Sequence, residues 1–319
     1  MNLKNQTAQA AEKEIFATDV LVIGAGTAGL SAAIYSLRSG HQVILLENNV
    51  HGGQILKTST VENYPAIGQI SGFDFANNLY RQAMDLGAKI YYHSLESANL
   101  GGKIKEVITS KGIFKAKTVI IANGAQHRKL GCEGEEEFTG RGVSYCATCD
   151  GAIYRGKNTA IIGGGNTALE DALFLANLCQ KVYLVHRRAE FRGANILAES
   201  VQARENIEIL YDSVVERIIG QDKVNAIEIK NLKDQSINTF PVEGVFIAVG
   251  LQPENGIFKD QVAVDGSGYI IAGEDCITDL PGVFVAGDTR TKILRQLVTA
   301  ASDGAVSGTQ ASIYINKNF

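Results

Sequence analysis

At about 150 residues per domain, a chain of 319 residues corresponds to roughly two domains with buried cores. Its 45% hydrophobic and 20% charged residues are typical of a globular protein and exclude a disordered or fibrous chain. The net charge of −4 removes the electrostatic basis for non-specific binding to nucleic acid or to an anionic membrane. Five cysteines are too few, and odd in number, for a disulfide-stapled secreted domain, so the composition indicates a reduced, cytoplasmic setting.

The N-terminal region reads as a polar leader followed by a strand. Residues 1–18 lack the apolar core of a signal peptide, and we predict that they are disordered. Residues 20–37 carry no charge, which by length alone would suit a membrane helix. Three glycines follow a short β-branched run there, however, so we predict a strand, a glycine turn and a helix of small residues.

The first glycine turn has the spacing of a dinucleotide-binding site. A predicted strand at 20–23 leads into the sequence G-x-G-x-x-G, in which the glycines allow a tight turn, close approach of a pyrophosphate and close packing of the next helix. A second strand, 43–46, ends in Glu47, whose carboxylate suits the ribose hydroxyls of an adenosine. The candidate residues of this turn are Gly24, Gly26, Thr27, Ala28 and Gly29.

The same pattern recurs in the second half of the chain. A strand at 159–162 precedes a turn in which Gly163, Gly165 and Ala168 correspond, at one constant offset, to the glycines of the first turn. Where the first unit has Glu47, this one has a basic cluster, which suits a 2′-phosphate and therefore NADP(H). The alternative is an ordinary solvated basic turn. The candidate nucleotide contacts are Gly163, Gly165, Asn166, Thr167, His186, Arg187, Arg188 and Arg192.

A C-x-x-C segment between the two turns offers a third redox group. Cys146 and Cys149 can close a small disulfide, exchange it with another disulfide, and receive protons from the adjacent Asp150. A zinc site would need a second cysteine pair, which Cys132, Cys179 and Cys276 do not form, so no metal is expected. A structural disulfide and two inert buried cysteines remain as alternatives.

In combination, these segments resemble the low-molecular-weight, bacterial-type NADPH-dependent thioredoxin reductases, which are class II pyridine nucleotide-disulfide oxidoreductases. The resemblance covers nearly all of the chain after about residue 18. It is carried by the segments 52–54 (GGQ), 62–65 (ENYP), 146–150 (CATCD), 186–192 (HRRAEFR), 281–288 (PGVFVAGD) and 295–300 (RQLVTA). Two departures are Asn123, where the family commonly has Thr, and Asn166, where it commonly has Asp.

The resemblance implies an α/β fold with two Rossmann-like domains, in which an NADPH domain is inserted into a discontinuous FAD domain. The implied boundaries are 19–128 with 256–319 for the FAD domain and 129–255 for the NADPH domain, which carries the dithiol. The chain segments that join them, 125–131 and 250–255, are rich in glycine and polar residues. Further flavin contacts implied by the resemblance are Gly53, Gln54, Asn63, Ala122, Gly287, Asp288, Arg295, Gln296 and Leu297.

The implied activity is reduction of thioredoxin, with electrons passing from NADPH through FAD and the dithiol. The resemblance places Cys149 against the flavin, assigns Cys146 to attack on the protein disulfide, and implies a homodimer whose NADPH domain rotates between two states. Two alternatives stay open: a related flavin reductase with another protein or small-molecule disulfide as acceptor, and a redox sensor without turnover.

Overall fold

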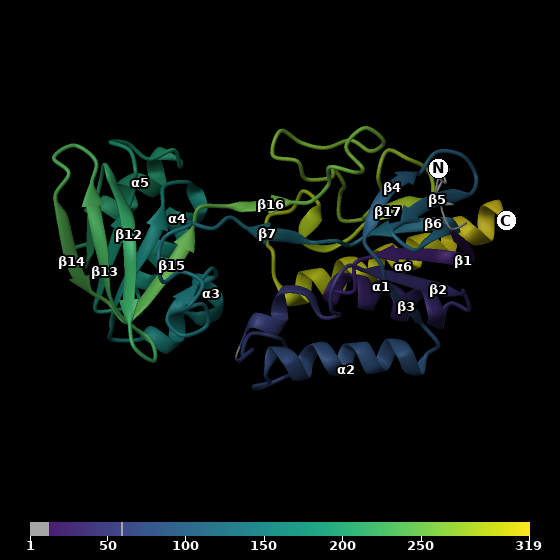
Figure 1. Cartoon of the computed structure of the whole chain (residues 1–319), viewed down its shortest axis with the longest axis horizontal. Coiled ribbons are helices and arrows are strands. Elements are labelled where there is room, and N and C mark those ends of the chain that lie inside the picture. Colours follow the sequence, from purple (N-terminus) through teal and green to yellow (C-terminus); the bar gives the residue numbers. More distant parts are fainter. Residues whose placement is uncertain (1–12, 59) are drawn as a thin grey trace, which may run out of the picture. The chain divides into compact units, whose positions relative to one another are not determined.

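The computed structural model describes residues 13–58 and 60–319 and divides them into two compact units (Figure 1). Unit 1 consists of the chain up to Leu56 together with Ser71–Ala125 and Pro253–Phe319. Unit 2 consists of Lys57–Ile70 and Gln126–Gln252. The segment Lys57–Ile70 thus groups with unit 2, although the predicted boundaries assign it to the first domain.

Unit 1 is built on a sheet with the strand order β3-β2-β1-β6-β5-β4, in which β17 also pairs with β6. The neighbours β3, β2, β1 and β6 are parallel, whereas β5 and β4 add to β6 in antiparallel fashion. The strands are β1 (Glu14–Ile23), β2 (Val43–Glu47), β3 (Lys89–Tyr92), β4 (Leu95–Asn99), β5 (Lys105–Thr109), β6 (Gly112–Ile121) and β17 (Val283–Val285). The helices are α1 (Thr27–Arg38), α2 (Gly72–Asp85) and α6 (Leu297–Asn318), with short 3-10 helices η1 (Gly53–Lys57) and η3 (Gly287–Thr289).

Residues 20–23 of β1 are apolar on both faces of the sheet, and both faces are covered there. Val20 and Val22 pack with α1 and α6, while Leu21 and Ile23 pack on the other side against residues such as Phe258. Each such side chain contributes about 1.5–3 kcal/mol when fully buried. Helices α1 and α6 approach each other closely, and a Cβ atom at position 304 of α6 would lie 2.3 Å from the Ala28 carbonyl oxygen of α1.

The predicted disordered leader is wrong for its last residues. Strand β1 begins at Glu14 and pairs with β6 from Glu14 opposite Gly112 to Ile23 opposite Ile121. The physical reason is Phe16, whose ring stacks on Phe114 with 4.8 Å between ring centroids. That apolar contact extends the strand beyond its obvious hydrophobic run. Residues 1–12 lie outside the described part of the chain.

Unit 2 contains a parallel sheet with the order β11-β10-β9-β15-β8 and a separate antiparallel sheet, β12-β13-β14. The parallel strands are β8 (Val143–Ser144), β9 (Asn158–Gly163), β10 (Lys181–Val185), β11 (Ile207–Leu210) and β15 (Gly244–Ala248). The antiparallel strands are β12 (Ser213–Gly220), β13 (Val224–Asn231) and β14 (Ile237–Pro241). The helices are α3 (Ala147–Asp150), α4 (Asn166–Ala176) and α5 (Asn195–Gln202), with the 3-10 helix η2 (Gly151–Tyr154).

The parallel sheet of unit 2 lies between two apolar layers. On one face Ile162 and Ile247 pack against β12–β14, and on the other Ile161 and Phe246 pack against α4. Each unit therefore places a glycine turn between a buried parallel strand and a helix. The predicted α/β fold with two Rossmann-like units is confirmed.

The chain passes between the units four times, after Leu56, Ile70, Ala125 and Gln252, and the last two passages run in short strands that pair with each other. These strands are β7 (Ala125–His127) and β16 (Leu251–Pro253). Within residues 13–58 and 60–319, no helix combines the length and apolar character that a membrane span requires.

Candidate nucleotide and disulfide sites

The glycine turn of unit 1 has space only for glycine at two positions. Gly24 has φ +103°, and a Cβ there would lie 2.4 Å from the Ala122 carbonyl oxygen. A Cβ at Gly29 would lie 1.9 Å from the carbonyl oxygen of Gly24. Helix α1 begins directly after Gly26 without a side-chain cap, so its first N–H groups are available to an anion such as a pyrophosphate.

Glu47 holds this turn from the end of β2. Its Oε2 atom accepts the Ala25 N–H at 2.9 Å, and its Oε1 atom accepts the N–H groups of Asn48 at 2.8 Å and Asn49 at 3.1 Å. These bonds fix the carboxylate beside the glycine turn. A carboxylate has about four acceptor positions, so one is left for a ribose hydroxyl.

Asp288 is a half-buried acid in η3, which follows β17. Burial is the main cause that raises the pKa of its carboxyl group above the usual value. Its Oδ1 atom is buried and has no hydrogen-bond partner among the residues that the structure describes. Such an orphaned acceptor costs about 1–3 kcal/mol unless a ligand donates to it, and hydroxyl groups of a flavin nucleotide are suitable donors. The preceding Gly287 has φ +79°, and a Cβ there would lie 2.8 Å from the Ala28 Cβ.

Asp303 of α6, which was not predicted from the sequence, holds the backbone of η3 beside Asp288. Its Oδ2 atom accepts the Gly287 N–H at 2.9 Å and pairs with Arg290 Nε at 2.8 Å and Lys292 Nζ at 2.9 Å. Burial raises the pKa of Asp303, but the bonds from Arg290 and Lys292 outweigh it and hold the pKa below its usual value. The only sequence signal was an acid inside an otherwise small-residue helix.

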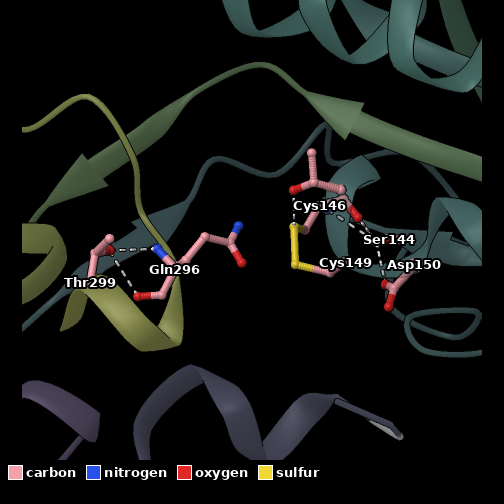
Figure 2. Close-up of a disulfide and its surroundings, with 7 residues drawn as sticks. Ser144, Cys146, Cys149, Asp150, Gln296 and Thr299 are labelled. Atoms are coloured by element: carbon pink, nitrogen blue, oxygen red, sulfur yellow. Dashed lines mark hydrogen bonds between the residues drawn. A yellow bond between two sulfur atoms is a disulfide. The ribbon is translucent and has the colours of Figure 1, made fainter. Parts of the chain in front are cut away.

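The other predicted flavin contacts lie in different settings. Gln54 donates through Nε2 to the Ala125 carbonyl oxygen. Gln296 forms a capping box with Thr299 at the start of α6 (Figure 2). Leu297 is the first residue of this helix. The guanidinium of Arg295 lies over the Tyr269 ring, 4.2 Å from its centroid, which accounts for this side chain without a cofactor.

Gly53 and Asn63 differ in how closely they approach the turn. A Cβ at Gly53, which has φ +71°, would lie 3.2 Å from the Gly26 Cα atom, so Gly53 borders the glycine turn. Asn63 is exposed and lies in the segment Lys57–Ile70, which groups with unit 2. Its place beside the flavin stays a prediction.

The glycine turn of unit 2 repeats the geometry of the first. A Cβ at Gly163 would lie 2.5 Å from the Ala248 carbonyl oxygen and 2.6 Å from the Ala168 Cβ. Helix α4 begins after Gly165 without a side-chain cap. Asn166 and Thr167 are exposed at its first turn, and Asn166 Oδ1 accepts the Ala194 N–H at 2.8 Å. This N-terminus is again open to an anion.

The basic cluster divides into one buried and three exposed side chains. Arg187, Arg188 and Arg192 are exposed, and none of them forms an ion pair within the described residues. His186 is 5% exposed, its Nε2 lies 2.9 Å from the Glu190 carbonyl oxygen, and its ring fills the space where Gly164 lacks a side chain. Burial lowers its pKa, so the ring is neutral at pH 7 and shapes the turn.

Cys146 and Cys149 form a disulfide, with 5.3 Å between their Cα atoms (Figure 2). Ser144 Oγ donates to Asp150 Oδ2 at 2.6 Å and accepts the Cys146 N–H at 3.1 Å. Burial raises the pKa of Asp150, which favours a protonated carboxyl group one residue from Cys149. Ser144 was not predicted, although a hydroxyl two residues before the first cysteine was visible in the sequence.

Cys132, Cys179 and Cys276 are free thiols. Burial raises the pKa of Cys132 to about 11 and that of Cys276 to about 12, so both remain protonated near neutral pH. Protonated, buried thiols of this kind pack as small hydrophobic side chains. In the described part of the chain, no group of three or more His, Cys, Asp or Glu side chains is arranged to hold a metal ion.

Comparison with known proteins defines the class. Residues 18–304 match the family model described as pyridine nucleotide-disulphide oxidoreductase, and the chain belongs to this family. Its relatives include a thioredoxin reductase of Listeria innocua, 41% identical over 97% of this chain and 96% of the relative. A thioredoxin reductase of Treponema pallidum is 39% identical over 93% of this chain and 97% of the relative.

The solved structures agree with this result. The crystal structure of thioredoxin reductase from Streptococcus pyogenes is 40% identical to this chain and has a TM-score of 0.91, over 94% of this chain and 99% of that one. The resemblance inferred from the sequence motifs is confirmed.

Proposed function

We propose that this protein is a thioredoxin-disulfide reductase that passes electrons from NADPH through FAD and the Cys146–Cys149 pair to oxidised thioredoxin. The observation that carries the proposal is a bonded C-x-x-C disulfide in the same chain as two open glycine turns. Relatives named thioredoxin reductase, about 40% identical over nearly the whole chain, support the same substrate.

The FAD site is assigned to 19–128 with 256–319, and the NADPH site to 129–255. Glu47 beside the first turn favours a nucleotide with free ribose hydroxyls, and the unpartnered Asp288 Oδ1 fits further hydroxyl groups of the flavin nucleotide. Three exposed arginines beside the second turn favour a 2′-phosphate, which distinguishes NADPH from NADH. When bound, the two cofactors supply hydride donation and two-electron transfer.

The residues of the disulfide carry out the exchange with the substrate. In the reduced enzyme, the Cys146 thiolate attacks one sulfur of the thioredoxin disulfide, and the other sulfur leaves as a thiolate. The Cys149 thiolate then attacks Cys146 in the mixed disulfide, which restores the Cys146–Cys149 bond and releases the second thioredoxin thiol. Asp150 is the group placed to donate the proton that a leaving thiolate needs, and burial raises its pKa, which favours this role.

Further parts of the proposal rest on the family resemblance. Unit 2 rotates about the crossings β7 and β16, so that the nicotinamide and the disulfide use the flavin in turn. The protein is a cytoplasmic homodimer, and the sparse, odd number of cysteines supports the reducing compartment.

The direct test is steady-state turnover of purified enzyme with NADPH and oxidised thioredoxin, compared with low-molecular-weight disulfides and other disulfide-containing proteins. We expect thioredoxin to give the highest kcat/KM. A higher kcat/KM with another disulfide would identify a related reductase with a different acceptor. NADPH binding without reduction of any disulfide would identify a redox sensor.

A further inference from the structure

Asn255 is a buried amide that uses its full hydrogen-bonding capacity. It is 3% exposed and lies two residues after the crossing strand β16. Its Nδ2 atom donates to the carbonyl oxygens of Gly268 at 2.9 Å and Thr289 at 3.1 Å. Its Oδ1 atom accepts from Thr289 Oγ1 at 2.7 Å and from Asn123 Nδ2 at 3.2 Å. An amide side chain has two donors and two acceptor positions, and all four are occupied.

One side of this network reaches the crossings at β7 and β16, where the chain leaves unit 1 after Ala125 and re-enters it at Pro253. Asn123 lies two residues before β7, and its Nδ2 atom also donates to the Glu254 carbonyl oxygen at 3.0 Å, directly after β16. Asn255 and Asn123 together therefore fasten both crossings to unit 1.

The other side of the network reaches Asp288. Thr289 is 0% exposed and follows Asp288 in η3. Its hydroxyl donates to Asn255 Oδ1, and its carbonyl oxygen accepts from Asn255 Nδ2, so both groups are fixed. The backbone on the opposite side of Asp288 is fixed as well, since the Gly287 N–H donates to Asp303. Asp288 thus lies between two anchored neighbours, while its own Oδ1 atom has no hydrogen-bond partner in the described part of the chain.

We propose that Asn255 is a positioning residue for the flavin nucleotide, because it fixes Thr289, and through it the Asp288 carboxylate, relative to the two crossings. The proposal rests on the proposed role of Asp288 in FAD binding. Asn255 itself contacts no cofactor in this account. Asn255 restricts the orientation of Asp288 before FAD binds. Part of the conformational entropy that Asp288 would lose on binding FAD is therefore already lost on folding.

The test is a double-mutant cycle on FAD affinity with Asn255→Ala, Asp288→Asn and the double variant. The FAD dissociation constant is measured by flavin fluorescence as FAD is released from purified holoenzyme on dilution. We expect each single variant to weaken FAD binding about tenfold. We expect the double variant to bind FAD no more weakly than Asp288→Asn alone, because Asn255 acts through Asp288.

Gln261→Ala is the matched control, because Gln261 is also an amide that joins segments of unit 1. It accepts the Leu100 N–H at 2.7 Å and donates to the Ala98 carbonyl oxygen at 2.8 Å, and neither of these bonds involves η3. We expect it to lower the melting temperature while leaving the FAD dissociation constant within about twofold of the parent. A loss of affinity in Asn255→Ala no greater than in Gln261→Ala would overturn the proposal, as would additive losses in the double variant.

A second pair of variants decides the question if Asn255→Ala does not fold. Thr289→Val removes only the hydroxyl that donates to Asn255, whereas Thr289→Ser keeps it. We expect Thr289→Val to weaken FAD binding about threefold or more and Thr289→Ser to restore it; equal affinities would contradict the inference. If Asp288→Asn itself leaves FAD affinity unchanged, the proposed flavin role of Asp288 fails instead, so the two failures are distinguishable.

Discussion

Ser144 Oγ lies 2.6 Å from Asp150 Oδ2 and thus ties the acid to the backbone that precedes Cys146. Burial raises the pKa of Asp150, whereas the bond from Ser144 lowers it, and burial is the larger effect. The carboxyl group is therefore held beside the disulfide in a form that favours the proton.

Asp150→Asn tests this role in proton transfer. We expect thioredoxin turnover to fall about 100-fold, because the amide cannot exchange a proton with the leaving thiolate. Flavin reduction by NADPH should remain within about twofold of the parent. Ser144→Ala is the comparison variant, and it should retain most of the activity with its pH profile displaced to higher pH.

The melting temperature of Asp150→Asn relative to the parent should change with pH in one defined direction. The pKa of Asp150 is raised in the folded state above the usual value of 3.8, so the folded state binds more protons than the unfolded state. The contribution of Asp150 to stability is therefore lost as pH rises above about 3.8. We expect Asp150→Asn to have a higher melting temperature than the parent at pH 7 and to lose this advantage toward pH 3. A constant difference across that range would contradict the raised pKa.

Cys146→Ser tests the order of the electron path. The variant should bleach its flavin absorbance with NADPH at a rate close to the parent, yet show no thioredoxin turnover, because the attacking thiolate is missing. Cys132→Ser is the control, since Cys132 is a free thiol outside the disulfide, and it should keep full turnover. Retention of turnover in Cys146→Ser would refute the assigned role.

Replacing Arg187 and Arg188 together by Gln tests the choice of nucleotide. Each lost phosphate contact removes about 1.5–3 kcal/mol, so the KM for NADPH should rise at least tenfold while that for NADH changes little. Arg217→Gln is the control, because Arg217 is an exposed arginine of unit 2 that pairs with Glu228. Equal increases for both nucleotides would contradict recognition of the 2′-phosphate.

Gly29→Ala tests the close approach in the first glycine turn. The added Cβ would lie 1.9 Å from the Gly24 carbonyl oxygen, so the helix or the turn must move. We expect a loss of about 3 kcal/mol or more in the free energy of unfolding, together with weaker FAD binding. Gly266→Ala meets no atom within 4 Å and should be nearly neutral in a denaturant titration. Similar losses in both variants would show that the turn is not constrained.

The sequence predicted those features that depend on neighbouring residues. The two glycine turns, Glu47 at the end of β2 and the Cys146–Cys149 pair follow from local spacing, and the α/β fold follows from the buried strands around them. Contacts between distant segments were not predictable in this way. The hydrogen bonds of Asn255 to Asn123 and Thr289 join three separate segments, and no local pattern marks such a network.

The error in the leader has a similar cause. Residues 14–18 were assigned to the leader because their partners in β6 lie about 100 residues away. His186 aligns with Glu47 in the repeat, and its contact with a nucleotide stays a prediction. The packing of its ring in the space over Gly164 was not predictable, because it depends on the three-dimensional arrangement of the turn.

The most direct test of the account is an anaerobic experiment with the flavin-loaded enzyme, in which NADPH is added first and oxidised thioredoxin second. Flavin absorbance is followed through both steps. We expect bleaching on addition of NADPH and recovery of the absorbance on addition of thioredoxin. Bleaching without recovery would contradict thioredoxin as the acceptor, and no bleaching would contradict the path from NADPH to the flavin.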